Sequence, residues 1–132
     1  MEPLRTLIVD DSPVMRKIVE RALRQAGIPI RQVIEAGNGL QALEVLRQQT
    51  VDLVLSDINM PGMGGLEFMR QISTIANARG VPVLMISAEG SESHVMQAIA
   101  CGARGYVRKP FTPDQMKRQV LPLLGQAVEA AG

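Results

Sequence analysis

Residues 53–65 read Leu-Val-Leu-Ser-Asp-Ile-Asn-Met-Pro-Gly-Met-Gly-Gly, in which a short apolar run is followed by Ser56, the carboxylate of Asp57 and a glycine-rich loop. Because this run is apolar at consecutive positions, it favours a strand that is buried on both faces, as in a parallel sheet. Similar short runs recur along the chain at residues 7–9, 33–34, 83–86 and 106–107. The sequence therefore predicts five buried parallel strands.

The segments between and after these runs carry apolar residues three or four positions apart, which predicts five helices. Regular alternation of strand and helix predicts an α/β fold with helices on both faces of a parallel sheet. The stripes expected to face the sheet are Val14, Ile18, Ala22 and Ala26 with Met15, Val19 and Leu23; Leu40, Leu43 and Leu46; Leu66, Met69, Ile72 and Ile75; Val95, Ala98 and Ile99; and Met116, Val120 and Leu124.

The fifth helical segment carries two opposing signals. Thr112 and Gln115 have the spacing of a capping box, which predicts that the helix begins there. Pro122 falls inside the same pattern, where its ring removes a backbone donor. We therefore expect either a kink at Pro122 or a helix that ends near Val120 and restarts.

The composition is that of an ordinary globular protein. Of 132 residues, 46% are apolar and 20% are charged, which excludes a disordered tail and a coiled coil. The formal net charge of +1 gives no reason to expect nucleic acid or an anionic membrane as a partner. We expect a single domain over residues 1–132, with a frayed tail at residues 126–132.

The chain carries no sequence signal for export or membrane insertion. No apolar run approaches the ~20 residues of a membrane span, and the N-terminus does not resemble a signal peptide. The only cysteine, Cys101, excludes an intramolecular disulfide and a cysteine-based zinc site, and is expected to be a small buried apolar residue. The only histidine, His94, is expected on the surface. The protein is expected to be cytoplasmic.

Polar residues follow the apolar runs at the points where the strands should end. Ligands of open α/β sheets bind at the carboxyl ends of the strands, so these side chains should meet at one edge. Glu35 ends the second run and is expected to lie off to one side. The residues expected at the shared edge are Asp10 and Asp11, Asp57, Ser87 and Lys109.

Three clustered carboxylates repel one another unless a cation binds among them. Oxygen ligands with several waters suit magnesium (Mg²⁺) better than calcium or zinc. A phosphoryl group could fill an open coordination position, with Lys109 and Ser87 neutralising and bonding its oxygens. The chemistry implied is attack by a carboxylate on phosphorus to give an acyl phosphate.

Each of these residues alone has a simpler interpretation. Asp10 or Asp11 could be a helix cap, Asp57 a turn residue, Ser87 a turn or cap residue and Lys109 a solvated charge. A cis peptide bond before Pro110 would aim the lysine inward, whereas a trans bond would make an ordinary turn. The joint occurrence of all five at successive strand ends favours a site.

The set Asp10-Asp11, Asp57, Ser87-Ala88 and Lys109-Pro110-Phe111 resembles the receiver domain of bacterial two-component response regulators. The resemblance extends over residues 4–124, and within the family it is strongest to the single-domain chemotaxis regulators. It implies a flavodoxin-like, doubly wound fold with a five-stranded parallel sheet of strand order 2-1-3-4-5 and five helices.

By this resemblance, Asp57 accepts a phosphoryl group from the histidine of a sensor histidine kinase. Lys109, the Ser87 hydroxyl and the Ala88 backbone amide bind the phosphoryl group. Tyr106 is the switch aromatic, which turns inward into space that Ser87 vacates. The output surface is formed by the fourth helix, the fifth strand and the fifth helix.

The resemblance also implies a metal site and two tuning positions. Asp11, Asp57 and the Asn59 backbone carbonyl bind Mg²⁺ directly, and Asp10 binds it through water. Asn59 and Glu89 tune the rate at which the acyl phosphate hydrolyses. A phosphatase is a further possible partner.

Three classes of function follow for comparison. The first is a phosphorylation-controlled binding module, with the flagellar motor switch as its target and a stand-alone receiver that relays phosphate or regulates a kinase in another pathway as the alternative. The second is a phosphohydrolase of the haloacid dehalogenase type, which would carry Asp-x-Asp where this chain has Asp10-Asp11-Ser12. The third is a flavin or nucleotide carrier, whose phosphate would be repelled by Asp10-Asp11.

Overall fold

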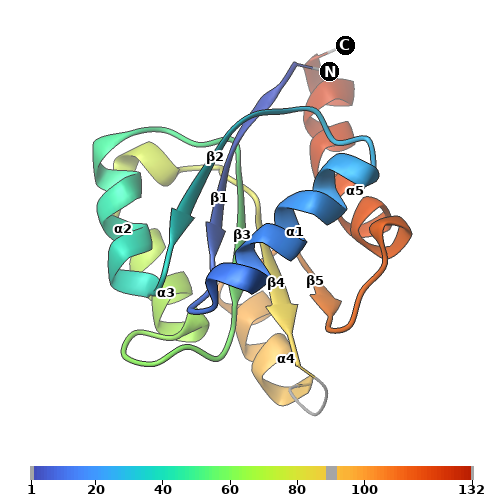
Figure 1. Cartoon of the computed structure of the whole chain (residues 1–132). Helices are drawn as coiled ribbons and strands as arrows, with labels where there is room; N and C mark the ends of the chain where they lie inside the picture. The colour runs from blue at the N-terminus through green and yellow to red at the C-terminus, as the bar shows by residue number, and fades with distance from the viewer. Residues whose placement is uncertain (1, 89–91, 132) are drawn as a thin grey trace.

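Five parallel strands form one sheet in the computed structural model, which describes residues 2–88 and 92–131 and gives side chains as far as residue 124 (Figure 1). The order of the strands is β2-β1-β3-β4-β5, as expected from the sequence. Their bounds are β1 Leu4–Val9, β2 Ile30–Ala36, β3 Leu53–Asp57, β4 Val83–Ser87 and β5 Gly105–Arg108.

Helices cover both faces of the sheet, which confirms the predicted fold class. α1 and α5 pack on one face, and α2, α3 and α4 pack on the other (Figure 1). The helices are α1 Pro13–Gln25, α2 Gly39–Gln48, α3 Gly65–Ile72, α4 Glu92–Ala100 and α5 Pro113–Ala131, with a short 3₁₀ turn at Ala76–Ala78.

Each central strand contributes to two apolar cores because its side chains alternate between the two faces. In β1, Leu7 and Val9 pack with α2, α3 and α4, whereas Leu4 and Ile8 pack with α1 and α5. Phe68 of α3 is the largest fully buried side chain. A strand with both faces buried reads as a continuous apolar run, which is why β1, β3 and β4 were visible in the sequence. The edge strands β2 and β5 are only partly buried, so the prediction that all five strands are buried is wrong for these two.

The predicted apolar stripe of the first helix is wrong at its beginning. Val14 is 70% exposed and Ile18 is 45% exposed, while Val19 and Leu23 are fully buried. A four-residue step turns about 40° beyond a full helical turn, so a stripe built only from such steps drifts around the helix. The sheet therefore contacts the line through Val19 and Leu23, and Val14 lies outside it.

Two other stripes contain exposed members for the same geometrical reason. Leu40 is 60% exposed although Leu43 and Leu46 are buried. A step of three residues falls about 60° short of a full helical turn, so Leu40 and Leu46 lie about 120° apart around the helix. Ile99 is 40% exposed beside the buried residues of α4. Ile75 is buried, but it lies beyond the end of α3 at Ile72 rather than within the helix.

The fifth helix begins where the capping box predicts and continues through its proline. The Thr112 backbone N–H donates to Gln115 Oε1 at 2.9 Å, and the Gln115 N–H donates to Thr112 Oγ1 at 3.1 Å. Pro122 lies within α5, so the alternative of a helix ending near Val120 is wrong. Pro122 is exposed, where water can bond the carbonyl left without a donor.

The side chains of residues 125–132 lie outside the described residues, and the fraying expected for residues 126–132 stays a prediction. Within the described part of the chain, no helix, the 19-residue α5 included, has the length and apolar character needed to cross a bilayer.

Candidate functional site

The predicted polar residues meet at the carboxyl edge of the sheet because the neighbouring strands β1, β3, β4 and β5 end side by side there. Asp57 is the last residue of β3 and pairs in register with Ile86, which precedes Ser87 at the end of β4. The Lys109 backbone N–H, just after β5, donates to the Ser87 carbonyl at 2.7 Å. Asp10 follows β1, which pairs with β3. The sheet register therefore sets the spacing of the site.

Lys109 joins the two buried carboxylates of this edge. Its Nζ lies 3.4 Å from Asp57 Oδ2 and 3.5 Å from Asp10 Oδ2. The Lys109–Pro110 peptide bond is cis. One ammonium thus bridges two carboxylates from different strand ends, so the interpretation of Lys109 as a freely solvated charge is wrong.

Asp10, Asp11 and Asp57 form an acidic group that could hold a cation. One carboxylate oxygen from each residue lies within 4.8 Å of the others. Asp10 and Asp57 are buried and Asp11 is exposed, so the group opens to solvent on one side. Three carboxylates with solvent access form the hard oxygen donor set that suits Mg²⁺. The residues present fit a divalent cation.

Burial governs the protonation of Asp57. Loss of solvent around its carboxyl group raises the pKa of Asp57 above its ordinary value, and the negative charge of Asp10 adds to the increase. The charge of Lys109 and a hydrogen bond from the Asn59 N–H to Asp57 Oδ1 at 3.3 Å lower the pKa and offset part of that increase. A divalent cation would favour the ionised form.

The raised pKa of Asp57 makes a prediction for stability in the absence of divalent cations. A carboxyl group whose folded pKa exceeds its unfolded value of about 3.9 binds a proton more readily when folded, so its contribution to stability falls as pH rises through that interval. In a chelating buffer, we expect the free energy of unfolding of the parent to fall relative to Asp57→Asn as pH rises from 4 to 7. Urea unfolding followed by circular dichroism measures this difference, and a difference independent of pH would contradict it.

Of the other predicted site residues, Ser87, Ala88 and Tyr106 line one cavity, and the Asn59 N–H contacts Asp57. Ser87 is buried, and Ala88 and Asn59 are exposed. Tyr106 is 41% exposed. Glu89 lies outside the described residues, and its predicted role is untested.

The remaining single-residue predictions are confirmed in part. His94 is exposed, as expected. Cys101 is only half-buried, although it packs against the core shared by α2, α3 and α4. Glu35 lies on the edge strand β2, away from the acidic group, and pairs with Arg16.

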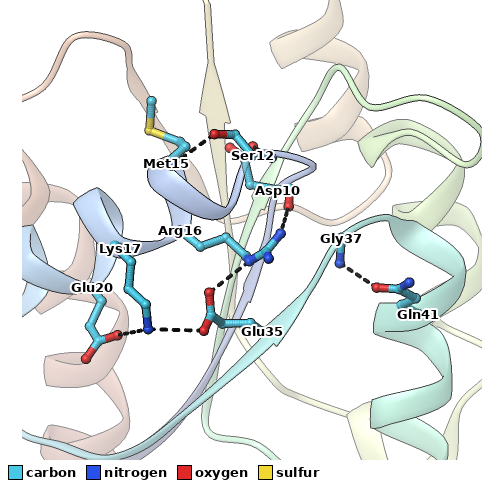
Figure 2. Close-up of polar contacts among 9 residues, drawn as sticks. All are labelled: Asp10, Ser12, Met15, Arg16, Lys17, Glu20, Glu35, Gly37 and Gln41. Atoms are coloured by element: carbon cyan, nitrogen blue, oxygen red, sulfur yellow. Dashed lines mark hydrogen bonds and ion pairs between the residues drawn. The ribbon is translucent and has the colours of Figure 1, made fainter.

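Sequence reasoning missed two residues that shape the site. Gly65, at the start of α3, leaves no room for a side chain, because an added Cβ would lie 2.5 Å from the Asp57 carbonyl oxygen. Arg16 donates through Nη1 to the Asp10 carbonyl at 2.5 Å (Figure 2). The glycine run at residues 64–65 was a signal for the first, whereas nothing in the sequence distinguishes Arg16 from the other cations of the helices.

Comparison with known proteins gives a consistent result. Residues 6–121 match the family model described as the response regulator receiver domain. Chemotaxis protein CheY-3 of Vibrio cholerae is 39% identical over 117 residues, which cover 89% of this chain and 88% of that protein. Chemotaxis protein CheY of Pseudomonas aeruginosa is 36% identical over 117 residues, covering 89% of this chain and 93% of that protein.

A solved structure is similar over nearly the same extent. It is the receiver domain of a sensor histidine kinase from Pseudomonas aeruginosa PAO1, with a magnesium ion coordinated in its active-site cleft. The TM-score is 0.80 at 27% sequence identity, and the match covers 94% of this chain and 99% of that one.

Proposed function

This chain belongs to the response regulator receiver domain family, and from that premise we propose that it is a phosphorylation-activated switch with Asp57 as its phospho-acceptor. Members of this family are signalling domains rather than conventional enzymes, so the phosphohydrolase and flavin-carrier alternatives are set aside. One observation supports the assignment most directly. The Lys109 ammonium lies 3.4 Å from Asp57 and 3.5 Å from Asp10, inside a group of three carboxylates.

The proposed reaction transfers a phosphoryl group from the phosphohistidine of a sensor histidine kinase. An Asp57 carboxylate oxygen forms a bond to phosphorus while the phosphorus–nitrogen bond breaks, and the histidine nitrogen keeps the electron pair and takes up a proton. Lys109 neutralises charge on the phosphoryl oxygens. The contacts of Oδ1 with the Asn59 N–H and of Oδ2 with Lys109 orient the Asp57 carboxylate before the phosphodonor binds.

Mg²⁺ is the proposed cofactor, and the acidic group fits it. Asp11, Asp57 and the Asn59 backbone carbonyl would hold the ion directly, and Asp10 would hold it through water. When bound, the ion neutralises the negative charge of carboxylates and phosphoryl group together. The similar receiver domain with a coordinated magnesium ion supports this proposal.

Phosphorylation would then bias a local switch. The new dianion attracts Lys109, the Ser87 hydroxyl and the Ala88 backbone amide through charge-assisted hydrogen bonds. A hundredfold shift toward the active state requires about 2.7 kcal/mol, which two such bonds of ~1.5–3 kcal/mol each supply. Tyr106 lines a cavity of about 160 Å³ together with Ser87 and Ala88, which supports its inward turn as the readout.

The proposed output surface is the face formed by α4, β5 and α5. Met96, Ile99 and Tyr106 are exposed on α4 and β5, where a protein partner could cover them.

We assign the flagellar motor switch as this partner and a chemotaxis-type histidine kinase as the phosphodonor, because the relatives are chemotaxis proteins. The protein would act in the cytoplasm, and Asn59 and Glu89 would tune dephosphorylation, with or without a phosphatase. The alternative is a stand-alone receiver in another phosphorelay. This alternative would be favoured if the phosphorylated protein bound a kinase and not the motor switch protein.

The phosphorylation proposal is tested with acetyl phosphate, a small donor that needs no kinase. We expect the protein to gain one phosphoryl group when Mg²⁺ is present, as measured by intact mass spectrometry. A chelator should prevent the gain, because the acidic group then lacks its cation. No gain by protein that is folded by circular dichroism would overturn the proposal.

A further inference from the structure

Asp10 is held by contacts at every polar atom. Its backbone N–H donates to the Ala36 carbonyl at 3.0 Å, and its Oδ1 accepts from the Ser12 N–H at 2.9 Å. Its Oδ2 lies 3.5 Å from Lys109 Nζ, and its carbonyl accepts from Arg16. Of these four contacts, two are with backbone groups and one is with Lys109 of the site itself. The fourth comes from the side chain of Arg16, which was not among the predicted site residues.

Arg16 is itself fixed from a second direction (Figure 2). Its Nε donates to Glu35 Oε1 at 2.8 Å, so one guanidinium links the loop after β1 to the edge strand β2. Lys17 Nζ holds the other Glu35 oxygen at 3.3 Å and lies 3.8 Å from Glu20. The hydrogen bond from Arg16 is the largest of the effects that lower the pKa of Glu35 below its ordinary value, so Glu35 is ionised at neutral pH.

Burial distinguishes Arg16 from its neighbour Lys17. The Arg16 side chain is 16% exposed, whereas that of Lys17 is 69% exposed and makes no described contact with Asp10. The planar guanidinium can donate to two acceptors in fixed directions, which a single ammonium cannot do in the same geometry. Arg16 therefore has the position and the shape to hold the loop that carries Asp10 and Asp11 against the edge strand β2.

We propose that Arg16, oriented by Glu35, is a positioning residue that fixes the loop carrying Asp10 and Asp11 and thereby strengthens Mg²⁺ binding. This proposal rests on the proposed function, because it concerns the cation site of the phosphorylation centre. Arg16 acts through the Asp10 backbone carbonyl, and no described hydrogen bond joins it to the three carboxylates of the acidic group. Outer contacts of this kind commonly change metal affinity by about 10-fold or more when they are removed.

The positioning role and a purely electrostatic role predict opposite changes in cation affinity when Arg16 is removed. Arg16 carries a positive charge near an acidic group, so its charge alone would repel a cation and its removal would tighten binding. Glu35 pairs with that charge at 2.8 Å and cancels much of the repulsion. If the hydrogen bond to the Asp10 carbonyl dominates, removal of Arg16 weakens cation binding despite the loss of a positive charge.

The test measures cation affinity directly, without a phosphodonor. Mn²⁺ is used as a paramagnetic substitute for Mg²⁺, and free Mn²⁺ is measured by electron paramagnetic resonance during a titration. We expect Arg16→Gln to raise the dissociation constant about tenfold. The control is Lys17→Gln, which removes a neighbouring positive charge and a Glu35 partner without touching Asp10; its affinity should match the parent or be slightly tighter.

A second readout separates positioning from a general loss of function. In acetyl phosphate reactions, Arg16→Gln should need a higher Mg²⁺ concentration for half-maximal rate but approach the parent rate at saturating Mg²⁺. Glu35→Gln, which leaves Arg16 less well oriented, should shift the Mg²⁺ dependence in the same direction by a smaller factor. Should Arg16→Gln not unfold cooperatively in urea, Arg16→Lys replaces it, with a smaller loss of affinity expected.

The outcomes distinguish this proposal from the proposed function. Unchanged or tighter Mn²⁺ binding by folded Arg16→Gln overturns the positioning role while leaving the phosphorylation site intact. If Arg16→Gln and Lys17→Gln weaken Mn²⁺ binding equally, the positioning role is also overturned. Both residues pair with Glu35, so an equal effect would be explained by the loss of a Glu35 partner and not by the contact with Asp10. A parent protein that binds no Mn²⁺ overturns the cation site and this inference together.

Discussion

Replacement of Asp57 by asparagine is expected to lower phosphoryl uptake from acetyl phosphate by at least about a thousandfold, because the nucleophile is lost. The amide oxygen of asparagine carries no formal charge, and the amide cannot form the acyl phosphate. The side chains have nearly the same shape, so β3 and its register with β4 should be retained. Intact mass spectrometry after incubation with acetyl phosphate and Mg²⁺ measures the loss.

The matched control for this substitution is Asp52→Asn. Asp52 precedes the opposite end of β3, where its Oδ2 accepts a hydrogen bond from the Arg5 N–H at 2.8 Å. It is exposed and lies far along the strand from the acidic group. Asp52→Asn should gain one phosphoryl group as the parent does. Equal uptake by Asp57→Asn and the parent would show that another residue is the acceptor.

The sequence predicted the strand ends well because two independent constraints coincide there. A strand covered on both faces is mostly apolar, so its end is indicated where polar residues begin, as at Ser56 and Asp57 of β3. In an open parallel sheet that end is also where ligands bind, so Asp57 and Ser87 were visible as site residues before any contact was known. Lys109 follows the last strand directly after Arg108, although β5 is an edge strand that is only partly buried.

The helices were predicted less accurately because their burial depends on orientation. A stripe is apolar over a wide arc, and its centre cannot be located from spacing alone when residues on its flanks are also apolar. Val14 and Ile18 illustrate this, since the sheet contacts Val19 and Leu23 instead. Substitutions at Val14 and Ile18 should therefore destabilise the fold less than substitutions at Val19 and Leu23.

The sequence placed Asp10, Asp57 and Lys109 at one edge of the sheet, but the individual atomic contacts between segments far apart in the sequence could not be predicted. Arg16 reaches Glu35 across 19 positions and Lys109 reaches Asp10 across 99. No periodicity links such residues, because only the sheet order brings β1 between β2 and β3. The composition of the site was thus readable from local patterns, whereas the contacts that orient it required the structure.

Gly65→Ala is expected to destabilise the protein by about 2–3 kcal/mol, although alanine is usually preferred to glycine in a helix. An added Cβ would lie 2.5 Å from the Asp57 carbonyl oxygen and 2.8 Å from the Ile58 Cα, and both are backbone atoms of the β3 end. Backbone at a strand end cannot move aside as a flexible side chain can. The steric cost therefore exceeds the gain of ~0.5–1 kcal/mol that the lower unfolded-state entropy of alanine brings.

The control is Gly37→Ala, where the nearest atom to an added Cβ is the Gln41 side-chain oxygen at 3.2 Å. That side chain can shift, so the change in unfolding free energy should stay below about 1 kcal/mol. Urea unfolding measures both variants. Since the backbone atoms that the added Cβ would press against belong to Asp57 and its neighbour, the folded variant should also be phosphorylated more slowly than Gly37→Ala at saturating Mg²⁺. Wild-type stability in Gly65→Ala would mean that α3 can shift away from the end of β3, and that the close packing there does not hold the phospho-acceptor in place.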